Sequence, residues 1–263
     1  MATFLVTFRE ALEAAIIVGI LFAFLNKNKA SEYRKFVWTG VFIGTLLSLF
    51  VGFLFRAFSE TLSERSAEIF EGIVALFGAL LITSLILWIH KHKDFSSKIE
   101  NDLSKNFSAK NFSFILIFTT FINILREGFE TVIFLSAIPE NNSLFDFFLG
   151  ILGIVFAILV GYLFYKGSLK IKLSTFFKIT NVLLILFAAG LIAYGIHELQ
   201  EAHILPIIVE HVYDINHIIN EKGTFGSILK GLFGYNGNPS LIELIAYWSY
   251  LIPAMYFTLR TKS

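Results

Sequence analysis

Two clusters of charged residues, Arg-Glu-Ala-Leu-Glu at 9–13 and Arg-Glu-Gly-Phe-Glu at 126–130, each lie within a long apolar stretch. In each cluster the two glutamates are three residues apart, so a helix places both carboxylates on one face. A charged side chain inside a membrane costs about 2.5–3.5 kcal/mol even on the mildest scale, so such groups indicate function. Carboxylate oxygens bind hard cations. The spacing therefore predicts a cation site built from four carboxylates: Glu10, Glu13, Glu127 and Glu130.

The composition indicates a membrane protein with many spans. Of the 263 residues, 56% are hydrophobic, and the mean hydropathy is +0.73, whereas soluble proteins are about 45–50% apolar. The apolar runs are continuous rather than alternating, which favours helices over a membrane β-barrel. The chain has no cysteine, which excludes disulfides, thiolate metal sites and iron–sulfur clusters. No basic stretch precedes the first apolar run, so we expect a retained span rather than a signal peptide.

We predict an all-α integral membrane protein in which residues 1–263 form a single transmembrane permease domain. A span needs about 20 apolar residues. The sequence predicts seven spans, at 4–25, 36–58, 68–90, 112–137, 144–166, 177–199 and 241–259. The segment 202–240 is rich in glycine and is expected to form short amphipathic helices on the outer surface.

The distribution of basic residues predicts the orientation. Fifteen lysines and arginines fall in the loops on one side of the predicted spans, and only Arg56, Arg65, Lys222 and Lys230 fall on the other. The positive-inside rule then places the N-terminus outside and the C-terminus inside. Both charged clusters lie at a similar depth, although their spans run in opposite directions. A 3+3 inverted repeat, with spans 1–3 in residues 4–90 and spans 4–6 in residues 112–201, would produce this arrangement.

The arginines of the two clusters bear on the charge of the site. We expect Arg9 to pair with Glu13, and Arg126 with Glu130, because each pair is four residues apart. One carboxylate on each helix would then stay unpaired, and the four glutamates and two arginines together carry a net charge of −2. A divalent cation would neutralise this charge. The alternative is a purely structural role, in which the ion pairs only lock the helices together.

A second group of acidic residues is expected at the outer ends of the third and sixth spans. Glu68 and Glu71 open the third, and His197, Glu198 and Glu201 close the sixth. We interpret these five residues as an outer vestibule for the ion, with solvated helix ends as the alternative reading. His197 does not begin a zinc-protease HExxH motif, because the residue four positions on is Glu201.

The two Arg-Glu-x-x-Glu clusters resemble the paired REGLE-type motifs of the high-affinity iron permeases. That family includes the fungal oxidase-coupled permease and the bacterial Efe-type ferrous permease. The resemblance extends through residues 68–72, 195–202 and 232–240, and so covers nearly the whole chain.

The resemblance implies an iron permease of the cytoplasmic membrane, not an enzyme. The carboxylates of Glu10, Glu13, Glu127 and Glu130 would carry the iron, and Arg9 and Arg126 would orient or balance them. Iron is then the transported substrate, with no permanently bound cofactor and no nucleic-acid partner. A copper oxidase or periplasmic iron-handling partner would be a separate chain. Fe²⁺ and Fe³⁺ both remain open at this point, as do a transporter of another divalent metal such as manganese or lead and a seven-span metal sensor.

Overall fold

The computed structural model describes residues 2–91, 103–104, 107, 111–138, 144–166, 173–221 and 223–260. In these residues the chain is helical and contains no strand. A short 3₁₀ turn at Ser31–Tyr33 precedes α2, and α8 is a short helix at Thr224–Phe233. The long helices are α1 (Ala2–Lys27), α2 (Arg34–Ser59), α3 (Glu64–Lys91), α5 (Phe112–Ser136), α6 (Leu144–Tyr165), α7 (Leu173–Glu201) and α9 (Leu241–Arg260).

These seven long helices correspond to the seven spans expected from the sequence. Six of them are long and apolar enough to cross a membrane. The exception is α1, because every 18-residue stretch of it contains three charged residues. In the segment 202–240 only α8 is helical among the described residues, and the rest consists of turns and bends. The expectation of several amphipathic helices there was therefore correct for α8 alone.

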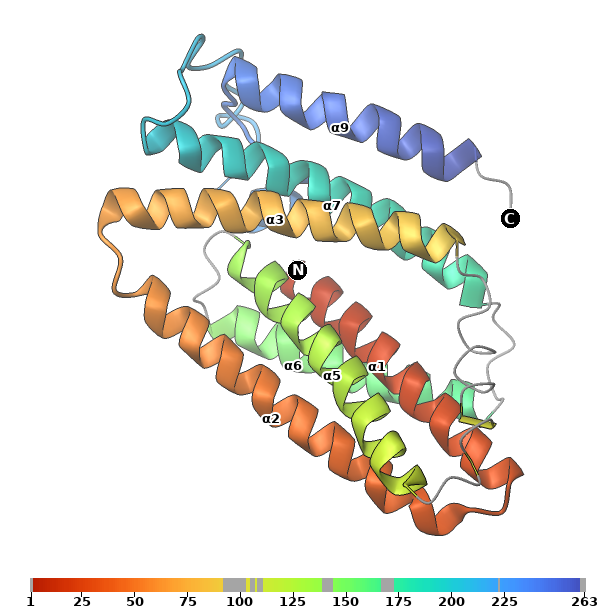
Figure 1. The fold of residues 1–263 in the computed structure, drawn as a ribbon. Helices are drawn as coiled ribbons and strands as arrows, with labels where there is room; N and C mark the ends of the chain where they lie inside the picture. Colours follow the sequence, from red (N-terminus) through yellow and green to blue (C-terminus); the bar gives the residue numbers. More distant parts are fainter. Residues whose placement is uncertain are drawn as a thin grey trace.

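Successive long helices run in alternating directions (Figure 1). One end of the bundle, which we call the Ala2 end, holds the starts of α1, α3, α6 and α9 and lies to the left in Figure 1. The other, the Lys27 end, holds the starts of α2, α5 and α7. As a result, the charged clusters of α1 and α5 lie side by side although the two helices are antiparallel.

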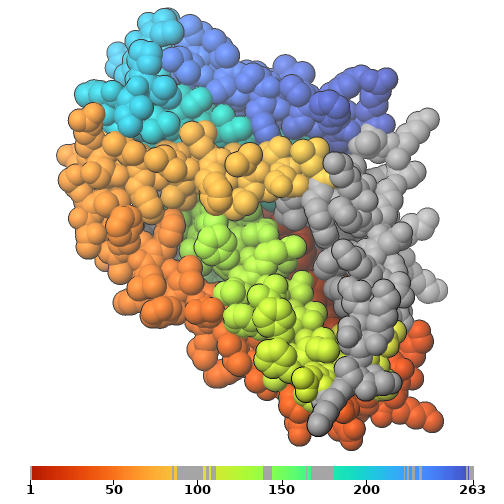
Figure 2. Space-filling view, in the orientation of Figure 1, coloured from red at the N-terminus to blue at the C-terminus, as the bar shows by residue number. Residues whose placement is uncertain are grey.

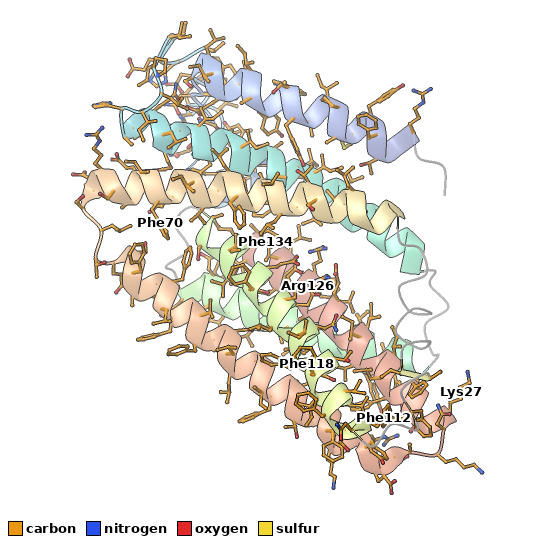
Figure 3. All side chains as sticks on the ribbon, in the orientation of Figure 1. Lys27, Phe70, Phe112, Phe118, Arg126 and Phe134 are labelled. Carbon is orange, nitrogen blue, oxygen red and sulfur yellow. The ribbon has the colours of Figure 1, made fainter. Side chains whose placement is uncertain are left out.

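The helices pack mainly as three pairs, α1 with α6, α2 with α5 and α3 with α7, and α9 covers α7. The α1 helix also packs against α5. On the face shown in Figure 2, α3 and α5 lie at the surface and most of α1 is hidden. A buried apolar cluster joins the α3–α7 pair to α1 and α5, and it includes Val6, Val74, Phe134 and Leu191. Figure 3 labels Phe134 on α5, close to α3.

Glycine allows the close contact between α1 and α6. A Cβ atom on Gly153 would lie 2.2 Å from Thr7 Oγ1 and 2.7 Å from the Phe4 carbonyl oxygen. We expect Gly153→Ala to lower the thermal midpoint of the detergent-solubilised protein by several degrees, because overpacking costs about 1–3 kcal/mol. Gly150→Ala on the same helix is the matched control, since its Cβ would make only ordinary contacts, with Thr3 Cγ2 at 3.6 Å and Thr7 Cγ2 at 3.7 Å. Equal midpoints for the two variants would contradict this packing.

Candidate metal centre

Helices α1 and α5 bring together three of the four glutamates expected at the site. Carboxylate oxygens of Glu10, Glu127 and Glu130 all lie within 4.8 Å of one another. Among the described residues, no other three histidine, aspartate or glutamate side chains come this close. Opposite ligands around one hard cation are about 4–5 Å apart, since each metal–oxygen bond is about 2.0–2.6 Å. The spacing therefore suits a single cation bound between the two helices.

Each arginine contacts both glutamates of its own cluster. Arg9 forms an ion pair with Glu10, and its Nη2 lies 2.6 Å from Glu13 Oε1. Arg126 repeats the arrangement on α5, with Nη2 3.0 Å from Glu127 Oε1 and Nε 3.3 Å from Glu130 Oε1. The expectation that one carboxylate per helix would stay unpaired was therefore wrong. A guanidinium group presents five N–H donors in a planar fork, so it can serve two carboxylates at once.

The two arginines differ in burial. The Arg9 side chain is 1% exposed, and the charges of all four glutamates act on it. The Arg126 side chain, labelled on α5 in Figure 3, is 40% exposed. Arg9 is thus the buried counter-ion of the whole cluster. Arg126 is partly exposed and pairs with the two glutamates of its own helix.

Some carboxylate oxygens of the cluster are buried without a hydrogen-bond donor. Among the described residues, none reaches Glu10 Oε2 or Glu127 Oε2. Glu10 and Glu127 are 1% and 3% exposed, so water does not compensate them as it does at a surface. A buried carboxylate without a donor is costly. A bound cation would satisfy these oxygens and neutralise the net charge of −2.

A groove with a volume of about 1200 Å³ leads to this cluster. Its walls come from α1, α2, α5 and α6, and Glu10 and Glu127 line it. Glu13 and Glu130 do not line the groove, and their side chains are 13% and 14% exposed. Two carboxylates of the cluster, those of Glu10 and Glu127, therefore face the groove, and the other two do not.

The structure places most of the expected vestibule residues between α3 and α7. These helices approach closely where Gly72 and Gly195 face each other, and a Cβ on either would lie 2.9–3.0 Å from the other's carbonyl oxygen. The residues directly before these glycines also meet, as the Tyr194 hydroxyl donates a 2.6 Å hydrogen bond to Glu71 Oε2. The charges of Glu71 and Glu68 both act on Glu198, so these three acids form one electrostatic group, bridged by Tyr194. Glu201 is exposed on its side chain and lies 4.0 Å from His197 Nε2.

Glu243 is a buried acidic residue that the sequence analysis missed. It lies in the first turn of α9 and is 3% exposed. Its Oε1 is 3.2 Å from His197 Nδ1, and its Oε2 accepts a 2.6 Å hydrogen bond from Asn236 Nδ2. The pattern Ser240-x-x-Glu243 is a capping-box signal that marks this helix start, but it does not reveal the contact with His197. The contact joins α9 to the end of α7.

We expect Glu243→Ala to lower the thermal midpoint by several degrees, because it leaves His197 and Asn236 without this partner at a cost of about 1–3 kcal/mol. Glu210→Ala is the control, as Glu210 is an exposed acid of the same outer segment. Differential scanning fluorimetry in detergent measures both. A midpoint for Glu243→Ala equal to that of the control would show that the contact with α7 does not stabilise the fold.

The fold and this cluster define a multi-pass helical membrane protein with clustered carboxylates in its interior. The chain belongs to the iron permease FTR1 family, whose sequence profile matches residues 1–260. The family resemblance predicted from the two charged clusters is thereby confirmed.

Curated relatives cover nearly the whole chain. The ferrous iron permease EfeU of Yersinia pestis is 32% identical over 258 residues, which span 96% of this chain and 90% of the relative. The EfeU of Yersinia pseudotuberculosis serotype I has the same identity and coverage. That of Escherichia coli O6:K15:H31 is 29% identical over 255 residues, or 96% of this chain and 92% of the relative. No solved structure matches the chain significantly.

Proposed function

We propose that this protein carries Fe²⁺ across the cytoplasmic membrane into the cell. The observation that carries the proposal is the meeting of acidic side chains from α1 and α5 in the bundle interior. The relatives are named ferrous iron permeases, and a divalent ion matches the net charge of −2 on the cluster. Carboxylate oxygen ligands suit Fe²⁺, and they also suit Mn²⁺.

In this proposal the four glutamates have unequal roles. Glu10, Glu127 and Glu130 hold the ion first, since their oxygens already converge. Glu13 stays beside Arg9 until the ion moves on, because its carboxylate lies 2.6 Å from that guanidinium and outside the converging group of three. Arg9 and Arg126 keep the empty site from carrying four uncompensated charges.

Helix contacts support an inverted repeat of α1–α3 and α5–α7. The contact of α2 with α5 resembles that of α6 with α1. In each, two glycines eight residues apart on the first helix meet two residues eight apart on the second. The two sets are Gly44 with Ile124 and Gly52 with Val132, and Gly153 with Thr7 and Gly161 with Ala15. Thr7 and Ile124 each lie two residues before the arginine of their cluster. Repeats of this kind let one half rock against the other around a central site, which suits a carrier.

The orientation proposed here puts the Ala2 end outside and the Lys27 end in the cytoplasm. By the sequence, fifteen lysines and arginines belong to the inter-span loops and tail on the side of Lys27, against four on the side of Ala2, and the positive-inside rule favours the side with fifteen as cytoplasmic. The acids Glu68, Glu71 and Glu198 then face the outside. A partner that oxidises or presents iron would act from that side.

Iron flux into sealed liposomes tests this function. We expect purified protein to admit Fe²⁺ under reducing conditions at a saturable rate, well above that of empty liposomes. Excess Mn²⁺ should compete weakly if iron is the physiological substrate, and strongly if the protein is a manganese transporter. Saturable binding of iron without any flux would contradict transport and favour a metal sensor.

A further inference from the structure

The groove beside the metal centre changes character along its length. From the Ala2 end to the carboxylates, its polar lining includes Thr3, Thr7, Ser48 and Thr131. Apolar side chains such as Phe53 and Phe147 line this half as well. Beyond the carboxylates, towards the Lys27 end, the lining includes Thr45 and several aromatic rings. Phe22 lies 5.8 Å from Trp38 and 6.5 Å from Tyr165, measured between ring centroids. We call the part between the carboxylates and the Ala2 end the polar half, because four of the five serine and threonine side chains that line the groove lie there.

The hydroxyl groups in the polar half are arranged to favour cations. Three of them donate to backbone carbonyl oxygens four residues earlier. Thr7 Oγ1 donates to that of Thr3 at 2.8 Å, Ser48 Oγ to that of Gly44 at 2.8 Å, and Thr131 Oγ1 to that of Glu127 at 2.7 Å. Each of these three hydroxyl protons is thus engaged within its own helix, whereas that of Thr3 goes to Asp146 on α6. The oxygen lone pairs are what remains for a cation or its hydration water.

Asp146 supplies the acidic group at the Ala2 end of the groove. It lies in the first turn of α6, lines the groove and accepts a hydrogen bond of 3.3 Å from Thr3 Oγ1. The other two charged residues at this mouth are Arg56 and Glu60, which pair with each other at 2.9 Å. From Thr3 to Glu10 is seven residues, or about 10 Å along α1. A cation attracted to Asp146 is therefore about 10 Å from Glu10, along the hydroxyl groups of the polar half.

In the described residues, an apolar contact separates the α3–α7 acids from the metal centre. The contact of these helices with α1 and α5 is made by the buried apolar cluster that contains Val6, Val74, Phe134 and Leu191. Neither Glu71 nor Glu198 lines the groove. The direct path from the α3–α7 acids to Glu10 therefore crosses apolar side chains, which is unfavourable for a hydrated cation.

We propose that the ion reaches Glu10 and Glu127 along the groove between α1, α2, α5 and α6, and that Asp146 is the carboxylate that attracts it at the mouth. This inference rests on the proposed iron transport and names the approach to the same site. It replaces the α3–α7 vestibule as the route, and it makes Asp146 a binding residue of the pathway.

Kinetics of Asp146→Asn test the capture step. We expect the KM for Fe²⁺ uptake to rise roughly three- to tenfold at low ionic strength, with an unchanged maximal rate, because a fixed negative charge raises the local cation concentration. The rise should shrink in high salt, whereas damage to the fold would lower the maximal rate at every salt concentration. Glu64→Gln is the control, since Glu64 is an exposed acid at the same end but does not line the groove. Equal KM values for the two variants would overturn the role of Asp146.

Thiol labelling tests the route itself, because the chain has no cysteine of its own. A membrane-impermeant, bulky thiol reagent added outside should modify Thr131→Cys and block its iron uptake, with the uptake of the unlabelled variant as reference. Ser63→Cys, at the exposed turn between α2 and α3, should be modified without a change in uptake. If Thr131→Cys is not modified, or keeps its uptake after modification, the groove is not the route.

The two proposals fail in different ways. The route alone would be overturned if Glu13→Ala and Glu130→Ala lose iron uptake while Asp146→Asn keeps the KM of its control and labelled Thr131→Cys keeps its uptake. Wild-type uptake in both glutamate variants would overturn the proposed function.

Discussion

Glu127→Gln is expected to lower Fe²⁺ uptake by at least about 100-fold with little change in folding. Glutamine has nearly the same shape, so the packing of α1 on α5 should survive. The substitution reduces the cluster charge from −2 to −1 and removes an anionic oxygen from the group of three. Changes even to groups that only support a metal ligand cost about 10–100-fold, so a direct ligand should cost more.

The measurement is radioactive iron uptake into liposomes, normalised to the amount of folded protein from size-exclusion chromatography. Glu10→Gln should behave like Glu127→Gln, because both carboxylates line the groove and both are buried. Glu64→Gln, which removes an exposed carboxylate, should transport as the wild type does. Uptake by Glu127→Gln above half the wild-type rate would contradict its role as a ligand.

Arg9→Met is expected to destabilise the protein far more than Arg126→Met. The Arg9 side chain is 1% exposed and that of Arg126 is 40% exposed. Removing one partner of a buried ion pair costs about 3–5 kcal/mol, because the other charge stays buried without compensation. At about 2–4 °C per kcal/mol, the thermal midpoint of Arg9→Met should fall by roughly 10 °C.

A second substitution separates lost charge balance from lost packing. Adding Glu13→Gln to Arg9→Met removes one of the carboxylates left without a counter-ion, so it should restore part of the lost stability. Adding Glu130→Gln to Arg126→Met should restore little, because that arginine is partly solvated. Equal losses of stability in Arg9→Met and Arg126→Met would contradict the view that Arg9 is the internal counter-ion.

Much of this arrangement was predictable from the spacing of residues. The long helices follow the apolar runs, and the i, i+3 spacing of the glutamates places both on one face of α1 and of α5. The similar depth of the two clusters follows from counting residues in antiparallel spans, and the structure brings Glu10, Glu127 and Glu130 together. Local periodicity is enough for these features because each depends on one helix or on the length of a span.

Other features depend on how helices pack, which one sequence does not reveal. The pairing of Arg9 with its neighbour Glu10 depends on side-chain conformations within the packed bundle. The groove exists because α1 packs on α6 while α2 packs on α5, and nothing in the spacing of glycines specifies which helices pair. Glu243 was missed because its partners His197 and Asn236 come from other parts of the chain.

A structure determined with bound iron tests the central claim most directly. Anomalous scattering at the iron edge should place the ion between α1 and α5, within about 2.0–2.3 Å of oxygens from Glu10, Glu127 and Glu130. Iron found only among the acids of α3 and α7, with the α1–α5 carboxylates still bound solely to Arg9 and Arg126, would contradict it.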